Sequence, residues 1–172
     1  FDGTDDYIDV PSSPSLNIYG NEITIAAWVR TSKLEWQVLV DEPNSITTHT
    51  SPWFDWALAI NSRKMSLYFG QDPHNLNTYQ IPADTWTHIA STYNGTTVKH
   101  YINGTEVDTK LGPYFGAIPN RVLNLIRIGA NGGRVISATP SGENFQGNID
   151  ELKVYNKTLT SQEILDLYNE KS

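Results

Sequence analysis

Apolar and polar residues alternate with a period of two along much of this chain. The clearest case is residues 23–30, in which Ile23, Ile25, Ala27 and Val29 share one face. Because successive side chains of a strand point to opposite faces, this pattern predicts a half-buried strand. Further strands are expected at 7–10, 36–40, 54–60, 64–70, 85–93, 97–102, 106–110, 123–129 and 145–155.

Turn residues separate several of these segments. Asn94-Gly95 and Asn103-Gly104 bracket a β-branched and aromatic run. Asn-Gly pairs favour the two-residue turns that join antiparallel strands, so both positions predict hairpins. Residues 61–63 are expected to close another hairpin. Loops are expected at 41–52, 71–80, 111–121 and 130–143.

The C-terminal part combines an irregular strand with a helix. Ile149, Leu152 and Val154 depart from strict alternation, which predicts a bulge near Asp150. The one helix expected covers 161–168, capped by Thr160 or Ser161. Many short strands and one terminal helix predict an all-β fold, an antiparallel β-sandwich formed by a single domain over residues 1–172.

Composition and charge narrow the functional classes. The net charge of −7 disfavours binding to nucleic acid or to a strongly anionic polymer. No apolar run approaches the roughly 20 residues of a membrane span, so membrane insertion is not expected. The chain has no cysteine, so its stability is expected to come from the core and a bound metal. Residues 1–3, which no signal peptide precedes, are interpreted as the start of a mature domain.

A series of short motifs resembles a known family. The motifs lie at residues 1–3, 23–29, 86–95, 101–104, 128–130, 145–151 and 155–160. In order and spacing they resemble the laminin-G-like, concanavalin A-like lectin/glucanase jelly roll over nearly the whole chain. The resemblance implies the jelly-roll fold and is weak for the ligand. Such domains often serve as carbohydrate-binding modules of secreted bacterial polysaccharide-degrading enzymes, and others serve adhesion or protein binding.

The resemblance also implies a structural calcium ion. In the family, calcium often ties the N-terminal strand to a C-terminal aspartate. Carried over, Asp2 and Asp150 would be carboxylate ligands, with Asn21 and backbone carbonyls completing the shell, and the first and last strands would lie side by side. Calcium takes about 6–8 oxygen ligands, which such a set suits. The alternative is that Asp2 and Asp150 only cap turns.

Catalysis is not expected of this domain. Retaining glycoside hydrolases of this fold carry a Glu-x-Asp-x-x-Glu strand, whose outer carboxylates act as nucleophile and acid/base. Here Asn148 and Lys153 replace the two glutamates around Asp150. An amide and an ammonium group cannot do that chemistry. Of the motifs of the alginate lyases that share this fold, only the tyrosine-rich strand has a weak counterpart here, at residues 68–70. A residual hydrolase or lyase is therefore the least favoured alternative.

Aromatic residues beside loops indicate a sugar-binding site. Aromatic rings stack on the apolar faces of sugars, and planar polar groups bind their hydroxyls. Trp28 and Trp86 are expected to be structural, and Phe54 to face the core, while Trp56 fits either the core or a groove. The candidate sugar-binding residues are Trp36, Asp41, His49, Trp53, Trp56, Tyr68, Gln71, Tyr114 and Arg121.

Together these features predict a non-catalytic, calcium-stabilised carbohydrate-binding module. It is expected to be a monomer, secreted or at the cell surface of a bacterium, joined to parent enzyme domains and bound to a polysaccharide or oligosaccharide. The acidic balance favours neutral glycans. The alternative is an adhesion or protein-interaction domain of a larger surface protein, with an exposed apolar patch and no aromatic-lined groove. Convergence of Trp36, Trp53, Tyr68 and Tyr114 in one cleft would favour the module.

Overall fold

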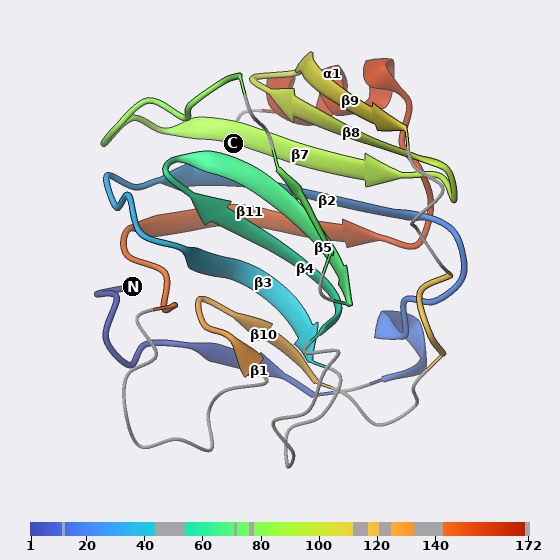
Figure 1. Cartoon of the computed structure of the whole chain (residues 1–172), viewed down its shortest axis with the longest axis horizontal. Helices are drawn as coiled ribbons and strands as arrows, with labels where there is room; N and C mark the ends of the chain where they lie inside the picture. Colours follow the sequence, from blue (N-terminus) through green and yellow to red (C-terminus); the bar gives the residue numbers. More distant parts are fainter. Residues whose placement is uncertain are drawn as a thin grey trace.

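Two antiparallel sheets face each other, and a helix lies outside one of them (Figure 1). The computed structural model describes residues 1–11, 13–43, 54–70, 72–75, 78–111, 117–120, 125–132 and 143–170. Over these ranges the chain forms eleven strands, the short 3-10 helix η1 (Pro14–Leu16) and one α-helix. The predicted β-sandwich with a C-terminal helix is confirmed.

The first sheet has six strands in the order β1-β10-β3-β4-β5-β6. They are β1 (Ile8–Val10), β10 (Ile126–Ile128), β3 (Gln37–Pro43), β4 (Phe54–Asn61), β5 (Lys64–Gly70) and β6 (Asp72–Asn75). The last of these falls in a range expected to be a loop because it is polar. That expectation is wrong, since β6 pairs through its backbone with β5, and backbone pairing does not require apolar side chains.

The second sheet has five strands in the order β11-β2-β7-β8-β9. They are β11 (Asn148–Tyr155), β2 (Ile23–Arg30), β7 (Thr87–Tyr93), β8 (Thr97–Ile102) and β9 (Thr105–Leu111). The predicted Asn-Gly turns join β7 to β8 and β8 to β9. Asn103 and Gly104 have φ values of 48° and 77°, the left-handed conformation that a two-residue hairpin turn requires. At the other pair only Gly95 has a positive φ, because Tyr93 pairs with Val98 and the connection is longer than two residues.

The main core lies between the two sheets. The inward face of β2, predicted from its alternation, is completely buried there. Trp56 of β4 belongs to the same core, and its Nε1 donates a 2.6 Å hydrogen bond to a carboxylate oxygen of Glu42. Phe54 was expected to be the core ring of this segment. Phe54 is indeed buried, but it packs on Tyr68 and not in the main cluster, because a register shift between Phe54 and Ala57 interrupts the alternation.

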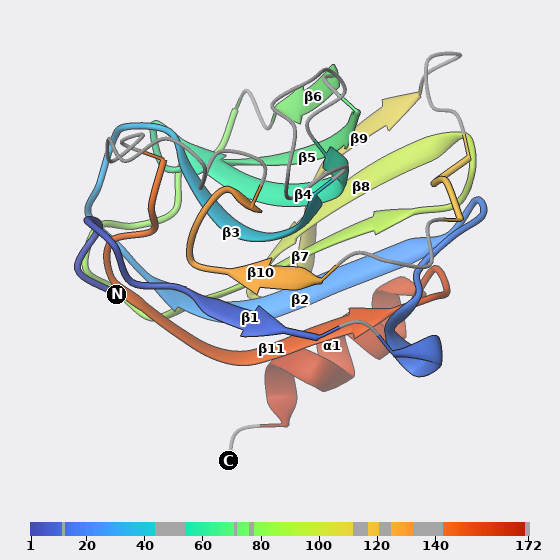
Figure 2. The same ribbon diagram turned by 90° about the horizontal axis from the view of Figure 1, so that it is seen from below.

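The helix α1 (Ser161–Asn169) covers the outer face of the five-stranded sheet (Figure 2). It begins with the predicted cap: Thr160 Oγ1 accepts from the backbone N–H of Glu163, and the Glu163 carboxylate accepts from the backbone N–H of Thr160. Ile164 anchors the helix in a second, smaller core with Ala26, Ala90, Tyr101 and Leu159. In the described part of the chain, no helix has the length and apolarity needed to cross a membrane.

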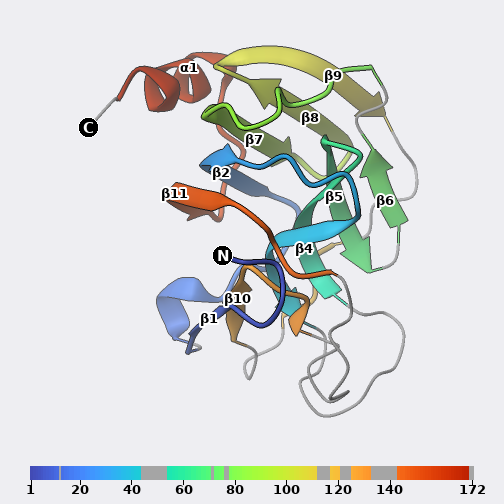
Figure 3. The same cartoon turned by 90° about the vertical axis from the view of Figure 1, so that its left-hand side faces the viewer.

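The first residues of the chain meet the segment before β11 (Figure 3). The Phe1 amino group donates to the carbonyl of Gly147 at 3.0 Å, and the Gly147 N–H donates to the carbonyl of Phe1 at 3.0 Å. Asp2 forms a β-bridge with Gln146. The first and last strands of the chain do not lie side by side as predicted, because β1 joins the six-stranded sheet and β11 the five-stranded one.

Candidate functional site

A row of paired residues crosses the outer face of the six-stranded sheet. Asp9 pairs with Arg127, Arg127 with Asp41, Asp41 with Ala57, and Ala57 with Tyr68. Paired residues of neighbouring strands point to the same face, and Val40, Leu58 and Leu67, which flank this row, pack into the core. The row therefore places a charged half, on β1, β10 and β3, beside an aromatic half on β4 and β5.

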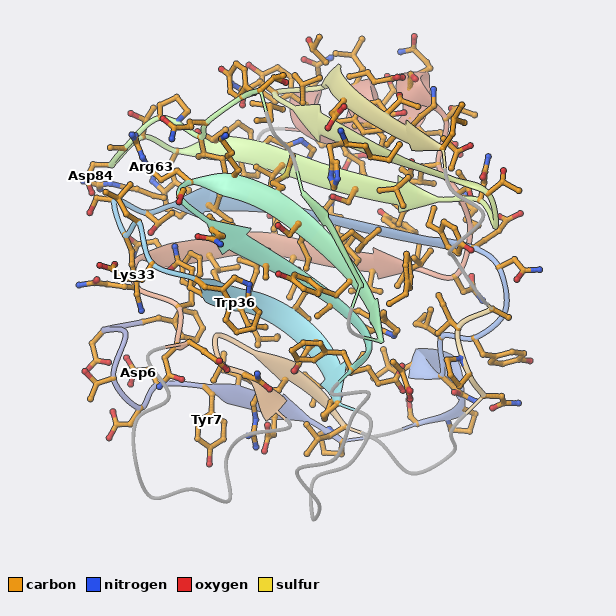
Figure 4. All side chains as sticks on the ribbon, viewed as in Figure 1. Asp6, Tyr7, Lys33, Trp36, Arg63 and Asp84 are labelled. Carbon is orange, nitrogen blue, oxygen red and sulfur yellow. The ribbon has the colours of Figure 1, made fainter. Side chains whose placement is uncertain are left out.

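Three rings form the aromatic half. Trp36 Nε1 donates a 2.9 Å hydrogen bond to Tyr68 Oη, and the two rings meet at 83° with centroids 5.9 Å apart. Phe54 lies 5.9 Å from Tyr68 and 6.4 Å from Trp36. Phe54 is buried, whereas Trp36 and Tyr68 are only partly buried. Figure 4 shows Trp36 over β3 and β4 on the face toward the viewer. These two rings are therefore the surfaces that a ligand can reach.

The Tyr68 hydroxyl is held neutral. Burial raises the pKa of Tyr68, and its hydrogen bonds with Trp36 and Ser66 act in the opposite direction. Because the neutral phenol is both a donor and an acceptor, it suits the hydroxyl groups of a sugar. Of the four residues expected to converge in one cleft, Trp36 and Tyr68 are in direct contact. The other two residues of that prediction, Trp53 and Tyr114, lie outside the described residues.

The charged groups of the other half are bonded to neighbouring protein groups and are not available to a ligand. Arg127 binds Asp9 through two hydrogen bonds, of 2.6 Å and 2.7 Å, and its guanidinium lies 4.2 Å from the centre of the Tyr7 ring. Asp41 is completely buried and accepts a 2.9 Å hydrogen bond from the backbone N–H of Gly132. Burial raises the pKa of Asp41 well above its usual value, although Gly132 and Arg127 oppose the rise. Asp41, a predicted sugar-binding residue, exposes no surface to a ligand here, because Gly132 packs over it.

The remaining predicted sugar-binding residues are not brought to this face. Trp56 has no exposed surface and belongs to the core, so its assignment to a sugar site is wrong. It points inward with Leu58 and Ile60, which follow it in alternation on β4. Four further candidates, His49, Gln71, Tyr114 and Arg121, lie outside the described residues, as Trp53 does.

The predicted calcium ligands are not brought together either. Asn21 lies beside Gly95 at the start of β2, whereas Asp150 pairs with Trp28 near the end of that strand. Asp2 is bridged to Gln146, which is roughly 13 Å from Asp150 at about 3.3 Å per strand residue. Calcium ligands lie about 2.3–2.6 Å from the ion, so these three residues do not form one shell.

Asp2 lies next to two other aspartates instead. One carboxylate oxygen from each of Asp2, Asp5 and Asp6 lies within 4.8 Å of the others, and all three residues are exposed. The backbone N–H of Thr4 donates to Asp2 Oδ1 at 2.7 Å, and that of Asp2 donates to Asp6 Oδ2 at 2.9 Å. These turns hold the carboxylates in place. An all-oxygen donor set of this kind fits a hard cation such as calcium.

The two tryptophans expected to be structural behave differently. Trp28 is partly buried: its ring stacks on Tyr168 of α1, with centroids 5.6 Å apart and an interplanar angle of 29°. Trp86, in contrast, is 42% exposed. It stands just before β7 begins, so the sheet does not bury it. The turn-forming run at 82–85 before it, which contains Pro82 and Asp84, was the available signal in the sequence.

The chain resembles known proteins in both sequence and fold. A family model described as the concanavalin A-like lectin/glucanases superfamily matches residues 2–165. No curated protein sequence matches the chain. The solved structures described next share at most 21% of their residues with this chain, so the likeness to them shows a shared fold.

Three solved structures illustrate this likeness. A native heptameric SAP-like pentraxin from Limulus polyphemus has a TM-score of 0.69 and 15% identity, and the match covers 98% of this chain and 83% of that one. Domain 4 of AbnA, an extracellular arabinanase from Geobacillus stearothermophilus, in complex with arabinotriose, has a TM-score of 0.69 and 21% identity, with 98% and 74% covered. Trypanosoma rangeli sialidase has a TM-score of 0.67 and 16% identity, with 98% and 26% covered.

Proposed function

Since the chain belongs to the concanavalin A-like lectin/glucanase superfamily, we propose that it is a non-catalytic carbohydrate-binding module for a neutral polysaccharide or oligosaccharide. The observation that carries the proposal is the hydrogen-bonded pair of Trp36 and Tyr68 on the outer face of the six-stranded sheet. The arabinanase domain solved with arabinotriose supports it as a fold relative that holds a neutral sugar.

The geometry of the pair suits a sugar ring. The two aromatic planes meet at 83° and form a corner, so one plane can lie under the apolar face of a sugar while the other lies at its side. The hydrogen bond between Trp36 and Tyr68 fixes the corner before a ligand arrives, which lowers the entropy lost on binding.

In its biological setting, the module would bind glycans outside the cell. We propose that it is secreted or displayed at the surface of a bacterium and joined to a polysaccharide-degrading enzyme. Holding that enzyme on its polymer raises the effective concentration of substrate without any new chemistry in the module. The net charge of −7 disfavours anionic polymers as the ligand, and the uncharged Trp36–Tyr68 pair fits a neutral glycan.

Replacing Trp36 with alanine is expected to weaken glycan binding at least tenfold, which corresponds to about 1.4 kcal/mol. The change removes one plane of the corner and the hydrogen bond to Tyr68. A glycan array identifies the ligand, and isothermal titration calorimetry then compares the wild type with Trp36→Ala.

The matched control is Trp86→Ala, which removes an exposed tryptophan elsewhere on the sandwich and is expected to leave this affinity within about twofold. The same samples are assayed for released sugars, and none is expected. The proposal fails if no plant, algal or bacterial glycan binds, if the two variants behave alike, or if a product forms.

A structural calcium ion at Asp2, Asp5 and Asp6 is a second part of the proposal. A metal that binds only the folded state stabilises it by about 2.7 kcal/mol at 100 times its Kd. Removing it with a chelator is expected to lower the Tm by roughly 5–10 °C for a chain of this size, and excess calcium to restore it. Differential scanning calorimetry measures both shifts.

Asp5→Asn is the informative variant, because the turn hydrogen bonds described above involve Asp2 and Asp6. It is expected to melt like the chelated wild type and to ignore added calcium. The control, Asp166→Asn on α1, is expected to keep the full calcium response. A wild-type melt that does not change in chelator would exclude the ion.

A further inference from the structure

A second open site lies on the other side of the sandwich, beside α1. It is a groove of about 480 Å³, a size within the usual range of small-molecule sites. Its lining residues are Trp28, Trp86, Asn103, Asp150, Glu151, Tyr168 and Glu170. This groove belongs to the five-stranded sheet and its helix, and shares no residue with the Trp36–Tyr68 pair.

Aromatic rings form one part of the groove. Trp86 is 42% exposed, the most exposed of the tryptophans in the described ranges. The Trp28 ring is fixed by stacking on Tyr168 and by an edge contact with His88, whose ring centre lies 5.6 Å away. Burial, with a smaller effect from Lys153, lowers the pKa of His88 to about 4, so the imidazole is neutral near pH 7. The aromatic wall is therefore rigid and brings no positive charge.

The bulge in β11 supplies the acidic part. Asp150 and Glu151 are consecutive, and strict alternation would place them on opposite faces of the sheet. The register shifts between Asp150 and Lys153, and Glu151 has a φ of 49°, so both residues line the groove. A residue other than glycine in this left-handed conformation is strained, and such strain is found preferentially where a site needs it.

The charges of the groove do not cancel. Three carboxylates line it, those of Asp150, Glu151 and Glu170. Among the described residues one ammonium group faces them: Lys153 Nζ lies 2.9 Å from Glu170 and 3.7 Å from Glu151. In the described part of the chain Asp150 pairs with no cation, and its Oδ1 accepts only the backbone N–H of Glu151 at 2.8 Å. The groove thus combines exposed indole surface with excess negative charge.

We propose that this groove binds a glycan unit that carries a protonated amine, the class of amino sugars to which glucosamine belongs. The apolar face of the sugar lies on Trp86, and its ammonium group pairs with Asp150. Asn103 Oδ1 already accepts the backbone N–H of His88 at 3.0 Å, which leaves the amide NH₂ of Asn103 to donate to a sugar hydroxyl. A lysine side chain has the same charge but lacks the flat apolar face that the ring offers. This site does not depend on the one proposed for neutral glycans.

The probe is a glucosamine oligosaccharide with free amines, compared with its fully N-acetylated counterpart of equal length. Calorimetry at a pH where the amines are protonated is expected to show at least tenfold tighter binding of the free-amine form. Added salt is expected to weaken that binding, because it screens an exposed ion pair. Trp86→Ala is expected to weaken it at least tenfold, and Asp150→Asn about fivefold.

Both substitutions lie on the surface, and the asparagine at 150 keeps an oxygen that can accept the Glu151 N–H, so folding is expected to persist and is checked by circular dichroism. Tyr19→Ala, which removes an exposed ring that does not line the groove, is the control and is expected to leave the affinity for the free-amine oligosaccharide unchanged. The proposal is overturned if the free-amine form does not bind, if both forms bind equally, if neither groove variant weakens binding, or if a lysine peptide binds as tightly. If Trp36→Ala loses binding to a neutral glycan and keeps binding to the free-amine oligosaccharide, the result concerns only the site at Trp36 and Tyr68.

Discussion

Gly147→Ala is expected to destabilise the domain by about 3–5 kcal/mol, and Gly20→Ala by only about 1 kcal/mol. Both glycines have positive φ, 137° and 95°, so an alanine at either site is strained. At Gly147 an added Cβ would also lie 2.1 Å from the carbonyl oxygen of Arg30, a backbone atom that cannot rotate away. At Gly20 it would meet nothing within 4 Å. The difference between the two variants isolates the steric cost of the contact with β2.

Urea denaturation of the wild type and both variants measures this difference, provided that the m-values agree. Gly147→Ala should also loosen the start of the chain, since the Gly147 N–H and carbonyl both bond to Phe1. Faster proteolysis within the first residues of this variant would report that loosening. Equal losses of stability at the two glycines would show that the backbone of β2 moves aside at low cost. That result would contradict a close, rigid contact between Gly147 and Arg30.

Trp56→Ala is expected to cost about 3–5 kcal/mol, the usual range for removing a large aromatic ring from a core. Trp56 has no exposed surface and packs between the sheets with residues of both. Trp56→Phe keeps most of the apolar volume and removes the 2.6 Å hydrogen bond to the Glu42 carboxylate, so about 1–2 kcal/mol is expected for it. The pair of variants therefore separates ring volume from hydrogen bonding.

Chemical denaturation gives these energies, and titration with the glycan gives the functional control. Binding by the folded fraction of Trp56→Phe is expected to match the wild type, because the ring does not reach the surface. A variant that stays as stable as the wild type while it loses glycan binding would place Trp56 in the ligand site and contradict its assignment to the core.

The fold was predictable where local rules decide it. The alternation over 23–30, the two Asn-Gly turns and the capping of α1 by Thr160 each correspond to a conformation set by nearby residues. The partner of β1 was not predictable in this way, because the pairing of Asp9 with Arg127 joins residues far apart in the chain. Likewise, β6 owes its existence to the neighbouring β5 more than to its own polar sequence.

The site was predicted in part for the same reason. Trp36 and Tyr68 were identified as candidates and do lie together, but their neighbour Phe54 was assigned to the core. The register shift after Phe54 places Trp56, and not Phe54, in the main core cluster. No glycine or other residue typical of a bulge stands in that stretch, so the sequence did not predict the shift. The exposure of Trp86 was missed because its structural role was inferred from a matching position in the family, which does not report how far a given ring is buried.

The irregularity of β11 has one more consequence, for self-association. This strand is the outermost one of its sheet, and a straight, regular ladder at that position would be open to pairing with another copy of the chain. The break between Asp150 and Lys153 interrupts the ladder, and the charges of both residues oppose the close approach of a second strand. The feature that shapes the groove therefore also guards an open edge against aggregation.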